Sequence, residues 1–426
     1  MLNKVGPDVS DGPMTGQGGP QITQIDADGI DEKRMKKRTV QLGDVCTIVG
    51  GGTPSRDRPD YYGGTIPWMT VKDFGDGFSI RSTQERITQA GLDNSASRLI
   101  PAGNVIIGTR MSVGNATLNQ IDLAINQDLK ALLCRSELLP EYLTFFLASA
   151  APGLEAKATG ATVKGITIDE IQELGIPLPS LSEQCRIAAM LEQADQLRRT
   201  RRYALELSDS FLPAAFLKMF GEPVDNPHRY PISTLEDELS AIESGFSPVC
   251  DGPRTSDDQW AVLGLGAVSS GVFKPEENKV LPLNIPPRPD IEVRNEDVLV
   301  TRKNTYDLVA ACALVRDPPP RLLLPDTIFR FVIRDRDRLM PAYLWALLTS
   351  ALFRKRVQSL AGGSAGSMPN ISKEKFMSVK LPIPPLTLQH RFADLVRGHE
   401  RFRATQRESL RQAEHLFQSL LHRAFQ

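Results

Sequence analysis

Short runs of glycine, hydroxyl-bearing and basic residues recur in this chain, and their side chains could bind a phosphate or hydrogen-bond a base. The loop 50–56 places Thr53, Ser55 and Arg56 directly after three consecutive glycines. Glycine allows a close approach of the backbone to a ligand, and hydroxyl and guanidinium groups donate hydrogen bonds to phosphates and base edges. The alternative is a glycine-rich turn between two strands. The loop is not a nucleotide-binding P-loop, because the pattern G-x-x-x-x-G-K-[ST] does not occur.

Each of two apolar, strand-like runs ends in an arginine. Arginine can hydrogen-bond guanine, asparagine can hydrogen-bond adenine, and lysine favours phosphate. A surface salt bridge is the plainer interpretation of one such arginine, but its repetition at a strand-to-loop junction favours contact with a nucleic acid. The runs are residues 105–109 and 298–301, and the polar residues at their ends are Arg110, Ser112, Arg302, Lys303, Asn304 and Tyr306.

Two further loops, 159–165 and 362–370, are small and polar, which suits a groove of a duplex as well as it suits plain solvent. Trp68 and Trp260 are predicted to be core residues rather than groups that stack on bases. The remaining candidates for nucleic-acid contact are Lys72, Thr162, Lys164, Ser247, Ser364, Ser367 and Asn370.

No group of residues has the pattern of a catalytic site or a metal site, and none is predicted. An adenine methyltransferase needs an Asn/Asp-Pro-Pro-aromatic motif, whose ring stacks on a flipped base. The segment 317–320 (DPPP) lacks that aromatic residue and is interpreted as a stiff loop. His415 and His422 share a helix face, but without a carboxylate beside them they are interpreted as surface residues. The five cysteines form no C-x-x-C pair, which argues against a zinc site or a disulfide framework and predicts buried free thiols.

The elements that must position these residues occur twice, about 200 residues apart, which is far beyond the period of a solenoid and indicates a duplicated module. Each copy has strand-like runs, a short buried helix that starts at a proline, and a stiff, extended proline-rich joint at 176–180 or 381–385. The matching segments are 104–110 with 297–302 (one residue deleted), 140–143 (PEYL) with 341–344 (PAYL), and 176–187 (IPLPSLSEQCRI) with 381–392 (LPIPPLTLQHRF).

A long helix with apolar residues at 3-4 spacing follows each copy. One such helix could lie on its own domain, but two copies favour mutual pairing as an antiparallel coiled coil. Pro213 is expected to kink or fray the first helix near its end. A helix of about 35 residues spans ~50 Å, which could hold two readers over separate half-sites of a duplex. The residues predicted for the helix or partner interface are Ile187, Leu191, Leu197, Phe211, Phe392, Phe402, Leu410 and Phe417.

Arginines cluster on both helices and could face the backbone of the DNA between two such half-sites, the spacer. The alternatives are a solvated helix face or pairing with acidic neighbours. The arginines concerned are Arg198, Arg199, Arg201, Arg202, Arg401, Arg403, Arg407 and Arg411.

The composition is that of an ordinary globular protein, with 41% hydrophobic and 24% charged residues among 426. No apolar run approaches the ~18 residues of a membrane span, and no secretory signal precedes the first module, so a cytoplasmic location is expected. A net charge of −1 is low for a nucleic-acid binder. Basic residues must therefore be gathered locally, or partner subunits must carry much of the backbone binding.

Several of these segments together resemble the specificity (S) subunits of Type I restriction-modification systems, the HsdS family. The resemblance covers about residues 39–426. The second copy departs from the pattern, because Leu388 replaces a glutamate before Gln389 and no full G-G-T-P loop occurs near 246. The segments that carry it are 50–56 (GGGTPSR), 61–73 (YYGGTIPWMTVKD), 176–184 and 219–221 (MFG).

The resemblance implies an α+β fold, with two similar mixed α/β target-recognition domains separated by two long antiparallel helices in a coiled coil and related by an internal pseudo-twofold repeat. Met35 lies directly before the start of the resemblance and is a candidate natural initiator. The expected parts are a disordered tail at 1–38, recognition domains at 39–180 and 221–385, a central helix at 181–220 and a C-terminal helix at 386–426.

The resemblance also implies partners. These are double-stranded DNA, two methyltransferase subunits and restriction/translocase subunits; S-adenosylmethionine and ATP are expected only in the partner subunits, which methylate adenine N6. Each recognition domain would read one half of a bipartite, asymmetric site, and this chain would catalyse nothing. The alternative from another class is a structural adaptor whose duplicated modules bind protein.

Overall fold

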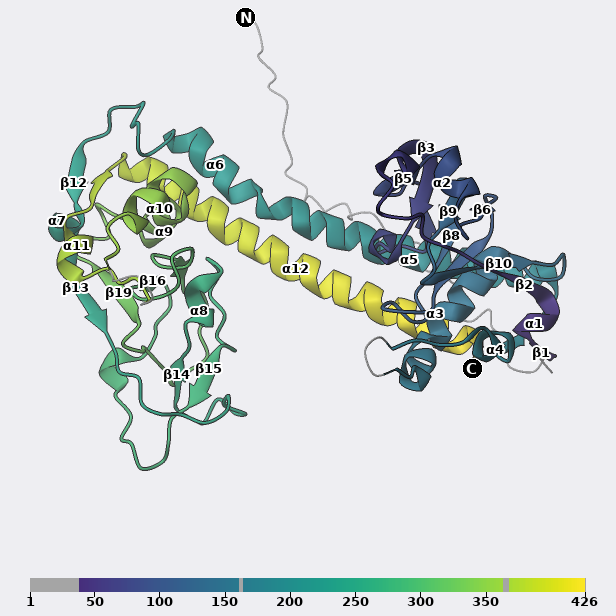
Figure 1. Ribbon diagram of the computed structural model, residues 1–426. Coiled ribbons are helices and arrows are strands. Elements are labelled where there is room, and N and C mark those ends of the chain that lie inside the picture. Colours follow the sequence, from purple (N-terminus) through teal and green to yellow (C-terminus); the bar gives the residue numbers. More distant parts are fainter. Residues whose placement is uncertain (1–37, 161–163, 363–367, 426) are drawn as a thin grey trace, which may run out of the picture. The chain divides into compact units, whose positions relative to one another are not determined.

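A computed structural model describes residues 38–160, 164–362 and 368–425. Figure 1 draws the chain, whose contacts divide it into two compact units. The first unit comprises the residues up to Glu192 and the last turn from Leu420, and the second comprises residues 193–419. Thr162, Ser364 and Ser367 lie outside the described residues. Within the described ranges, no helix is long and apolar enough to cross a membrane.

The first unit is built on a mixed five-stranded sheet and a smaller four-stranded one. The middle of the larger sheet is covered on both faces, and Ile106 and Ile107 are therefore both fully buried although they point to opposite sides. The larger sheet has the order β2 (Cys46–Gly50), β10 (Leu129–Cys134), β7 (Val105–Gly108), β8 (Ala116–Asn119) and β4 (Ser79–Ile80). The smaller has the order β5 (Glu85–Ile87), β3 (Tyr62–Met69), β9 (Leu123–Ile125) and β6 (Leu99–Ile100).

Several helices and a two-stranded sheet complete the first unit. Trp68 on β3 is 1% exposed, which confirms its prediction as a core residue. A two-stranded sheet joins β1 (Thr39–Gln41) to β11 (Gly175–Pro177). The helices are α1 (Leu42–Val45), α2 (Gln89–Asp93), α3 (Pro140–Lys157) and α4 (Ile168–Gln172), with single 3₁₀ turns at Pro59–Tyr61 and Val71–Asp73.

The second unit repeats this plan with four-, three- and two-stranded sheets. The sheets are β13 (Leu239–Ser244), β19 (Ile328–Ile333), β16 (Val298–Thr301) and β17 (Cys312–Leu314); β15 (Asn278–Val280), β14 (Ala261–Leu263) and β18 (Leu322–Leu323); and β12 (Ile232–Thr234) with β20 (Lys380–Pro382). Its shorter helices are α7 (Leu235–Glu238), α8 (Gly266–Ser269), α9 (Pro341–Thr349), α10 (Ala351–Gln358) and α11 (Lys373–Met377), with a 3₁₀ turn at Pro289–Ile291.

The strand orders show that the internal repeat is a duplication of fold. The order β2-β10-β7-β8 returns as β13-β19-β16-β17, and β5-β3-β9 returns as β15-β14-β18. The proline-rich joints are not only extended chain, because their first residues form β11 and β20, which pair with β1 and β12. We call residues 39–180 the first module and residues 221–385 the second module.

The strand register corrects one detail of the sequence alignment between the copies. Leu129 lies opposite Gly108 in the first module, and Ile328 lies opposite Thr301 in the second. Gly108 therefore corresponds to Thr301, and no residue is deleted between the copies. It follows that Arg110 corresponds to Lys303 and not to Arg302.

The predicted central helix is two helices. α5 (Leu181–Asp209) ends one residue before α6 (Phe211–Phe220), whereas α12 (Leu386–Phe425) is continuous over 40 residues. Pro213 lies in the first turn of α6, where a backbone N–H has no partner within its own helix to lose. Because the helix breaks at Ser210, Pro213 does not interrupt α5. Within the second unit α5 and α12 run antiparallel, since Arg202 pairs with Glu414 while Ser208 contacts His399.

A buried glutamine joins the first module to the start of α5. Gln184 is 0% exposed, and its Oε1 accepts a hydrogen bond from the backbone N–H of Leu139 at 2.8 Å. Its Nε2 donates to the carbonyl oxygens of Glu137 at 2.9 Å and Pro179 at 3.0 Å. One side chain thus ties the chain before α3, the proline-rich joint and the helix together.

The same network recurs in the second module. Gln389, also 0% exposed, accepts from the backbone N–H of Met340 at 2.9 Å and donates to the carbonyl oxygens of Arg338 at 3.0 Å and Pro384 at 2.9 Å. Buried amides are stable only when they are hydrogen-bonded, so each glutamine has one favoured placement. Tyrosines reinforce both joints: Tyr142 donates to the Pro177 carbonyl and Tyr343 to the Pro382 carbonyl, each at 2.8 Å.

We predict that Gln184→Leu destabilises the first unit by about 1–3 kcal/mol, because the buried backbone groups of the joint lose their partners. Hydrogen exchange of the peptides around Leu139 would measure the loss. Gln196→Leu is the matched control, since Gln196 lies exposed on the same helix. Equal exchange in the two variants would contradict the role of Gln184.

Candidate nucleic-acid interface

In each module, many of the residues predicted to contact a nucleic acid gather at one end of the larger sheet. In the first module β2 and β7 end where β10 begins, because Gly50 lies opposite Lys130 and Gly108 opposite Leu129. The loop 50–56 and Arg110 follow these strand ends. Gly165 lies at the same end, because it forms a β-bridge with Arg110. In the second module the same end carries Ser247, Arg302, Lys303 and Asn370.

A glycine holds the start of the first binding loop against the sheet. A Cβ on Gly51 would lie 2.3 Å from the carbonyl oxygen of Asn126. Its counterpart by register is Gly245, whose Cβ would lie 1.6 Å from the carbonyl oxygen of Leu324. Both values are below any normal contact, so only glycine fits. Neither glycine is among the site residues predicted from the sequence, although each stands directly before a short segment that ends in proline, residues 52–54 (GTP) or 246–248 (FSP).

A side-chain hydrogen bond closes the same loop in both modules. Thr53 donates to Gln127 in the first module, and Ser247 donates to Asp326 at the equivalent position of the second. Thr53 and Ser247 are both exposed, and the Ser247 hydroxyl also accepts a hydrogen bond from the Asp326 backbone N–H at 3.2 Å. The loop is therefore a fixed surface feature in both copies.

Arg56 is engaged within the first unit. Its guanidinium donates to Glu85, with an N–O distance of 2.9 Å, and lies 4.5 Å from the ring centre of Tyr62 and 5.4 Å from that of Trp68. The hydrogen bond that Arg56 donates to Glu85 raises the pKa of Arg56 further above its already high value. Because Glu85 balances its charge, Arg56 orders the loop in this structure rather than presenting a net cation.

Arg110, Lys164 and Lys72 are exposed. A Cβ on Gly165 would lie 3.1 Å from the Cγ of Arg110, so the arginine side chain runs across this glycine. Lys72 lies in the 3₁₀ turn after β3, whose last residue, Met69, pairs with Ile125 near the same sheet end. Ser112 is half-buried in the turn after Arg110, and Ser55 accepts a hydrogen bond from the Asp57 backbone N–H.

Asn304 is placed differently from its prediction as an adenine-reading residue. It is 5% exposed, its Nδ2 donates to Ser269 Oγ at 3.0 Å, and its Oδ1 accepts from the Thr305 backbone N–H at 2.8 Å. Its amide is used inside the module, so we correct the prediction: Asn304 shapes the loop. Tyr306 is 67% exposed, and Asn370 is half-buried with an Oδ1 that has no hydrogen-bond partner among the described residues.

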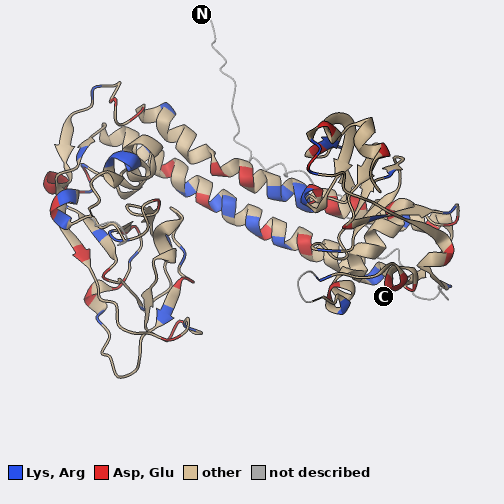
Figure 2. Cartoon of the chain, in the orientation of Figure 1, with Lys and Arg blue, Asp and Glu red and all other residues tan. Residues whose placement is uncertain are grey.

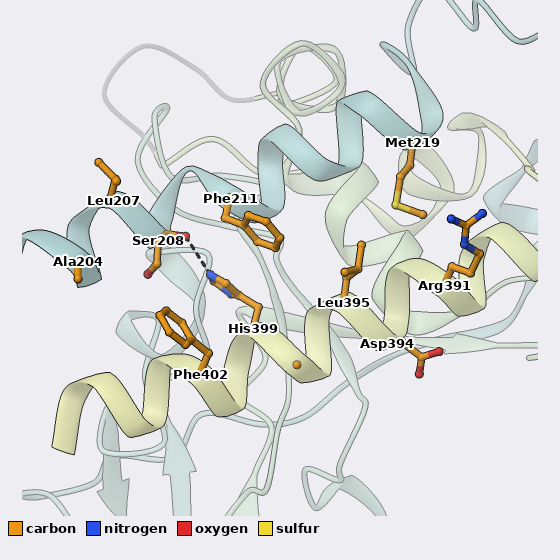
Figure 3. A pocket seen from close by; sticks show the side chains of 11 residues that line it. Ala204, Leu207, Ser208, Phe211, Met219, Arg391, Asp394, Leu395, His399 and Phe402 are labelled. Atoms are coloured by element: carbon orange, nitrogen blue, oxygen red, sulfur yellow. Dashed lines mark hydrogen bonds between the residues drawn. The ribbon is translucent and has the colours of Figure 1, made fainter. Parts of the chain in front are cut away.

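The helix residues predicted for an interface divide into two groups. Ile187, Leu191, Phe392 and Phe417 are buried, each 3% exposed or less, and Phe392 belongs to the hydrophobic core of the second module. Leu197 and Leu410 are half-buried. Phe211 and Phe402 are each 48% exposed and line a groove of about 820 Å³. Figure 3 shows this groove, with Leu207, Leu395 and His399 beside the two phenylalanines.

His399 is one of the polar residues that line this mainly apolar groove, with Ser208, Arg391 and Asp394. Its Nε2 lies 2.9 Å from the carbonyl oxygen of Ser208, and its ring stacks on Phe211 with centroids 5.4 Å apart. Burial lowers the pKa of His399, so the neutral form is favoured at neutral pH. A groove of this size on a paired helix surface could accept an apolar helix of a partner.

Acidic neighbours neutralise many of the helix arginines. Asp195, which is 0% exposed, pairs with Arg198 at 2.6 Å and Arg199 at 2.8 Å. Figure 2 shows acidic and basic residues interspersed along α5 and α12. This arrangement matches the alternative of acidic pairing better than that of a continuous basic face. Further pairs are Arg202–Glu414, Arg403–Asp209 and Arg411–Glu408.

Comparisons with known proteins agree with this architecture. Residues 35–207 match the family model of the Type I restriction modification DNA specificity domain. The specificity subunit of the Type I restriction enzyme EcoR124I/EcoR124II from Escherichia coli is 31% identical over 163 residues, which are 37% of this chain and 40% of that protein. The chain thus spans less than half the length of this relative in the alignment.

Two further likenesses extend over most of the chain. The specificity subunit of MjaVIII from Methanocaldococcus jannaschii is 21% identical over 403 residues, 88% of each chain. The solved S subunit of a Type I restriction-modification system from M. genitalium has a TM-score of 0.57 at 14% identity, covering 91% of this chain and 96% of that one. The latter likeness establishes the fold.

The duplicated mixed α/β module, with a long helix after each copy, defines a two-module protein. Residues 35–207 are thus similar in sequence to specificity subunits of Type I restriction-modification systems, and most of the chain is similar to one such subunit in fold.

We predict that Gly51→Ala destabilises the first unit by about 1–3 kcal/mol, because a methyl group cannot enter the space held by the Asn126 carbonyl. Gly50→Ala is the control, since a Cβ on Gly50 meets nothing within 4 Å. Hydrogen exchange across β2 and β10 would compare them. Equal protection in the two variants would show that the close approach is unimportant.

Proposed function

We propose that this chain gives a Type I restriction-modification complex its DNA sequence specificity. Each module would read one half of a bipartite, asymmetric duplex site, and the helices would set the spacer between the halves and bind the methyltransferase subunits. The single observation that carries this proposal is the duplicated fold: two modules with one strand order present different loops from the same sheet end. Two similar but unequal readers suit a target with two unequal halves.

The loop chemistry supports duplex DNA as the ligand. Exposed hydroxyl and basic groups, among them Thr53, Arg110 and Lys303, leave the end of each larger sheet. Such groups hydrogen-bond phosphates and base edges. The helix cations are largely balanced by carboxylates, so the modules rather than the helices would carry most of this chain's contact with DNA.

The catalytic chemistry would belong to the partners. Methyl transfer to adenine N6 needs S-adenosylmethionine and translocation needs ATP, and both would bind to methyltransferase and restriction/translocase subunits. In this chain, the Asp317 segment lacks the aromatic residue of a methyltransferase motif. The purified chain alone is accordingly expected to transfer no labelled methyl group to DNA.

A module exchange tests the two-reader proposal. The complex of this chain with its methyltransferase would first be used to enrich sequences from random duplexes, and a split motif is expected. Replacing residues 39–175 by the corresponding module of another specificity subunit should change one half of the motif and leave the other unchanged. A change in both halves would refute independent reading. Absence of any motif would favour the alternative, a protein-binding adaptor. The low net charge of −1 is compatible with that alternative.

The apolar groove supports the proposed attachment of a methyltransferase subunit to the helices. We predict that Phe402→Asp weakens this attachment by about tenfold or more, as expected for an aromatic anchor at an interface. Ala404→Asp is the control, because Ala404 is exposed on the same helix but does not line the groove. Calorimetric titration of each variant with the subunit would measure the difference. Equal affinities would place the attachment elsewhere.

A further inference from the structure

A basic residue occupies the same structural position in both modules. Arg110 forms a β-bridge with Gly165, and Lys303 forms the corresponding bridge with Asn370. Each follows the central strand that ends at the loop-bearing end of its sheet, and each side chain is exposed. Among the described residues, neither is in an ion pair.

A second cation lies beside Arg110. The Lys130 ammonium group donates to the carbonyl oxygens of Gln127 at 2.9 Å and Leu129 at 3.2 Å, which holds it near the sheet end. Burial, followed by the charge of Arg110, lowers the pKa of Lys130, while Asp128 opposes this shift. The Asp128 carboxylate accepts a hydrogen bond from the Asn126 amide and forms no ion pair with Lys130 in the described part of the chain. Lys130 thus adds a second cation at this sheet end, near enough to Arg110 to feel its charge, and neither side chain is in an ion pair among the described residues.

The second module keeps the charge but changes the residues that supply it. By register Phe329 stands where the first module has Lys130. The Arg302 guanidinium lies 5.3 Å from the ring centre of Phe329 and the Lys373 ammonium 5.7 Å from it. Contact with an aromatic face holds a cation in place without neutralising it. Positive charge is therefore gathered beside Lys303, as it is beside Arg110.

The position that follows the cation differs between the modules. Met111, which follows Arg110, is 74% exposed and has a φ of 60°, whereas its counterpart Asn304 is 5% exposed. Retention of the cation is therefore not a by-product of general similarity between the copies. Two modules that read different bases have one feature of their ligands in common, the phosphate backbone.

We propose that Arg110 with Lys130, and Lys303 with Arg302 and Lys373, form two equivalent phosphate-binding sites that position each module on duplex DNA without reading its sequence. This inference rests on the proposed function and names which residues hold the backbone. Base readout is then left to the side chains that differ between the two loop sets.

The test measures duplex affinity against salt for the complex with its methyltransferase, on its own motif and on random duplex. The variants are Arg110→Gln, Arg110→Lys and Lys303→Gln. Loss of one phosphate contact should lower the slope of log affinity against log salt by about 0.9, and should weaken binding to both duplexes alike, by about three- to tenfold at 0.15 M salt. Arg110→Lys should keep the slope, because a phosphate contact needs the charge rather than the guanidinium fork.

Arg135→Gln is the matched control, since Arg135 is exposed and follows Cys134 at the opposite end of β10. A slope in Arg110→Gln equal to that of Arg135→Gln would overturn the inference. So would an altered base preference in one half-site, or a loss on Arg110→Lys as large as on Arg110→Gln, because either identifies a base contact. Failure of the proposed function is seen separately, as a wild-type complex that enriches no split motif. The salt slope on random duplex still decides the phosphate contact in that case.

Discussion

The placement of each recognition module on its helix depends on one buried glutamine. Gln184 and Gln389 are themselves fully buried, and each binds one backbone N–H and two carbonyl oxygens of its joint. Their surroundings differ, since Glu183 precedes one and Leu388 the other, yet the network is the same. An amide with all its partners in place tolerates little rotation, and a displaced one leaves several unsatisfied groups. The proline-rich joint therefore fixes the orientation of each module relative to the start of the helix that follows it.

Comparison of the two modules separates the residues that hold the loops in place from the exposed residues that could select a target. Gly51 and Gly245 bring a loop against the sheet, and Thr53 and Ser247 close that loop by equivalent hydrogen bonds. These contacts concern the backbone and the loop base, so they need not change when the ligand changes. Beyond them an exposed cation is kept at Arg110 and Lys303, but the next position differs, because Met111 faces solvent where Asn304 is buried. A common framework with unlike surfaces is what two readers of different half-sites require.

Charge is distributed locally in a chain whose net charge is −1. Asp195 and Glu414 balance helix arginines, and Glu85 balances Arg56. Cations without ion-pair partners among the described residues remain at the loop-bearing sheet ends, where the binding loops leave. The helices instead offer the apolar groove of Phe211 and Phe402, a surface suited to protein. Local pairing thus explains how a nearly neutral chain can present both kinds of surface.

Sequence alone determined the features that depend on local pattern. It predicted the duplication, the strands at 105–109 and 298–301 and the starts of both long helices, because apolar periodicity and proline act over a few residues. Tertiary structure decided the rest. The equivalence of Arg110 with Lys303 depends on strand register, the balance of Arg56 on Glu85 29 residues away, and the burial of Asn304 on Ser269 35 residues away. Such contacts join segments whose spacing along the chain carries no periodic signal, so only the folded chain brings them together.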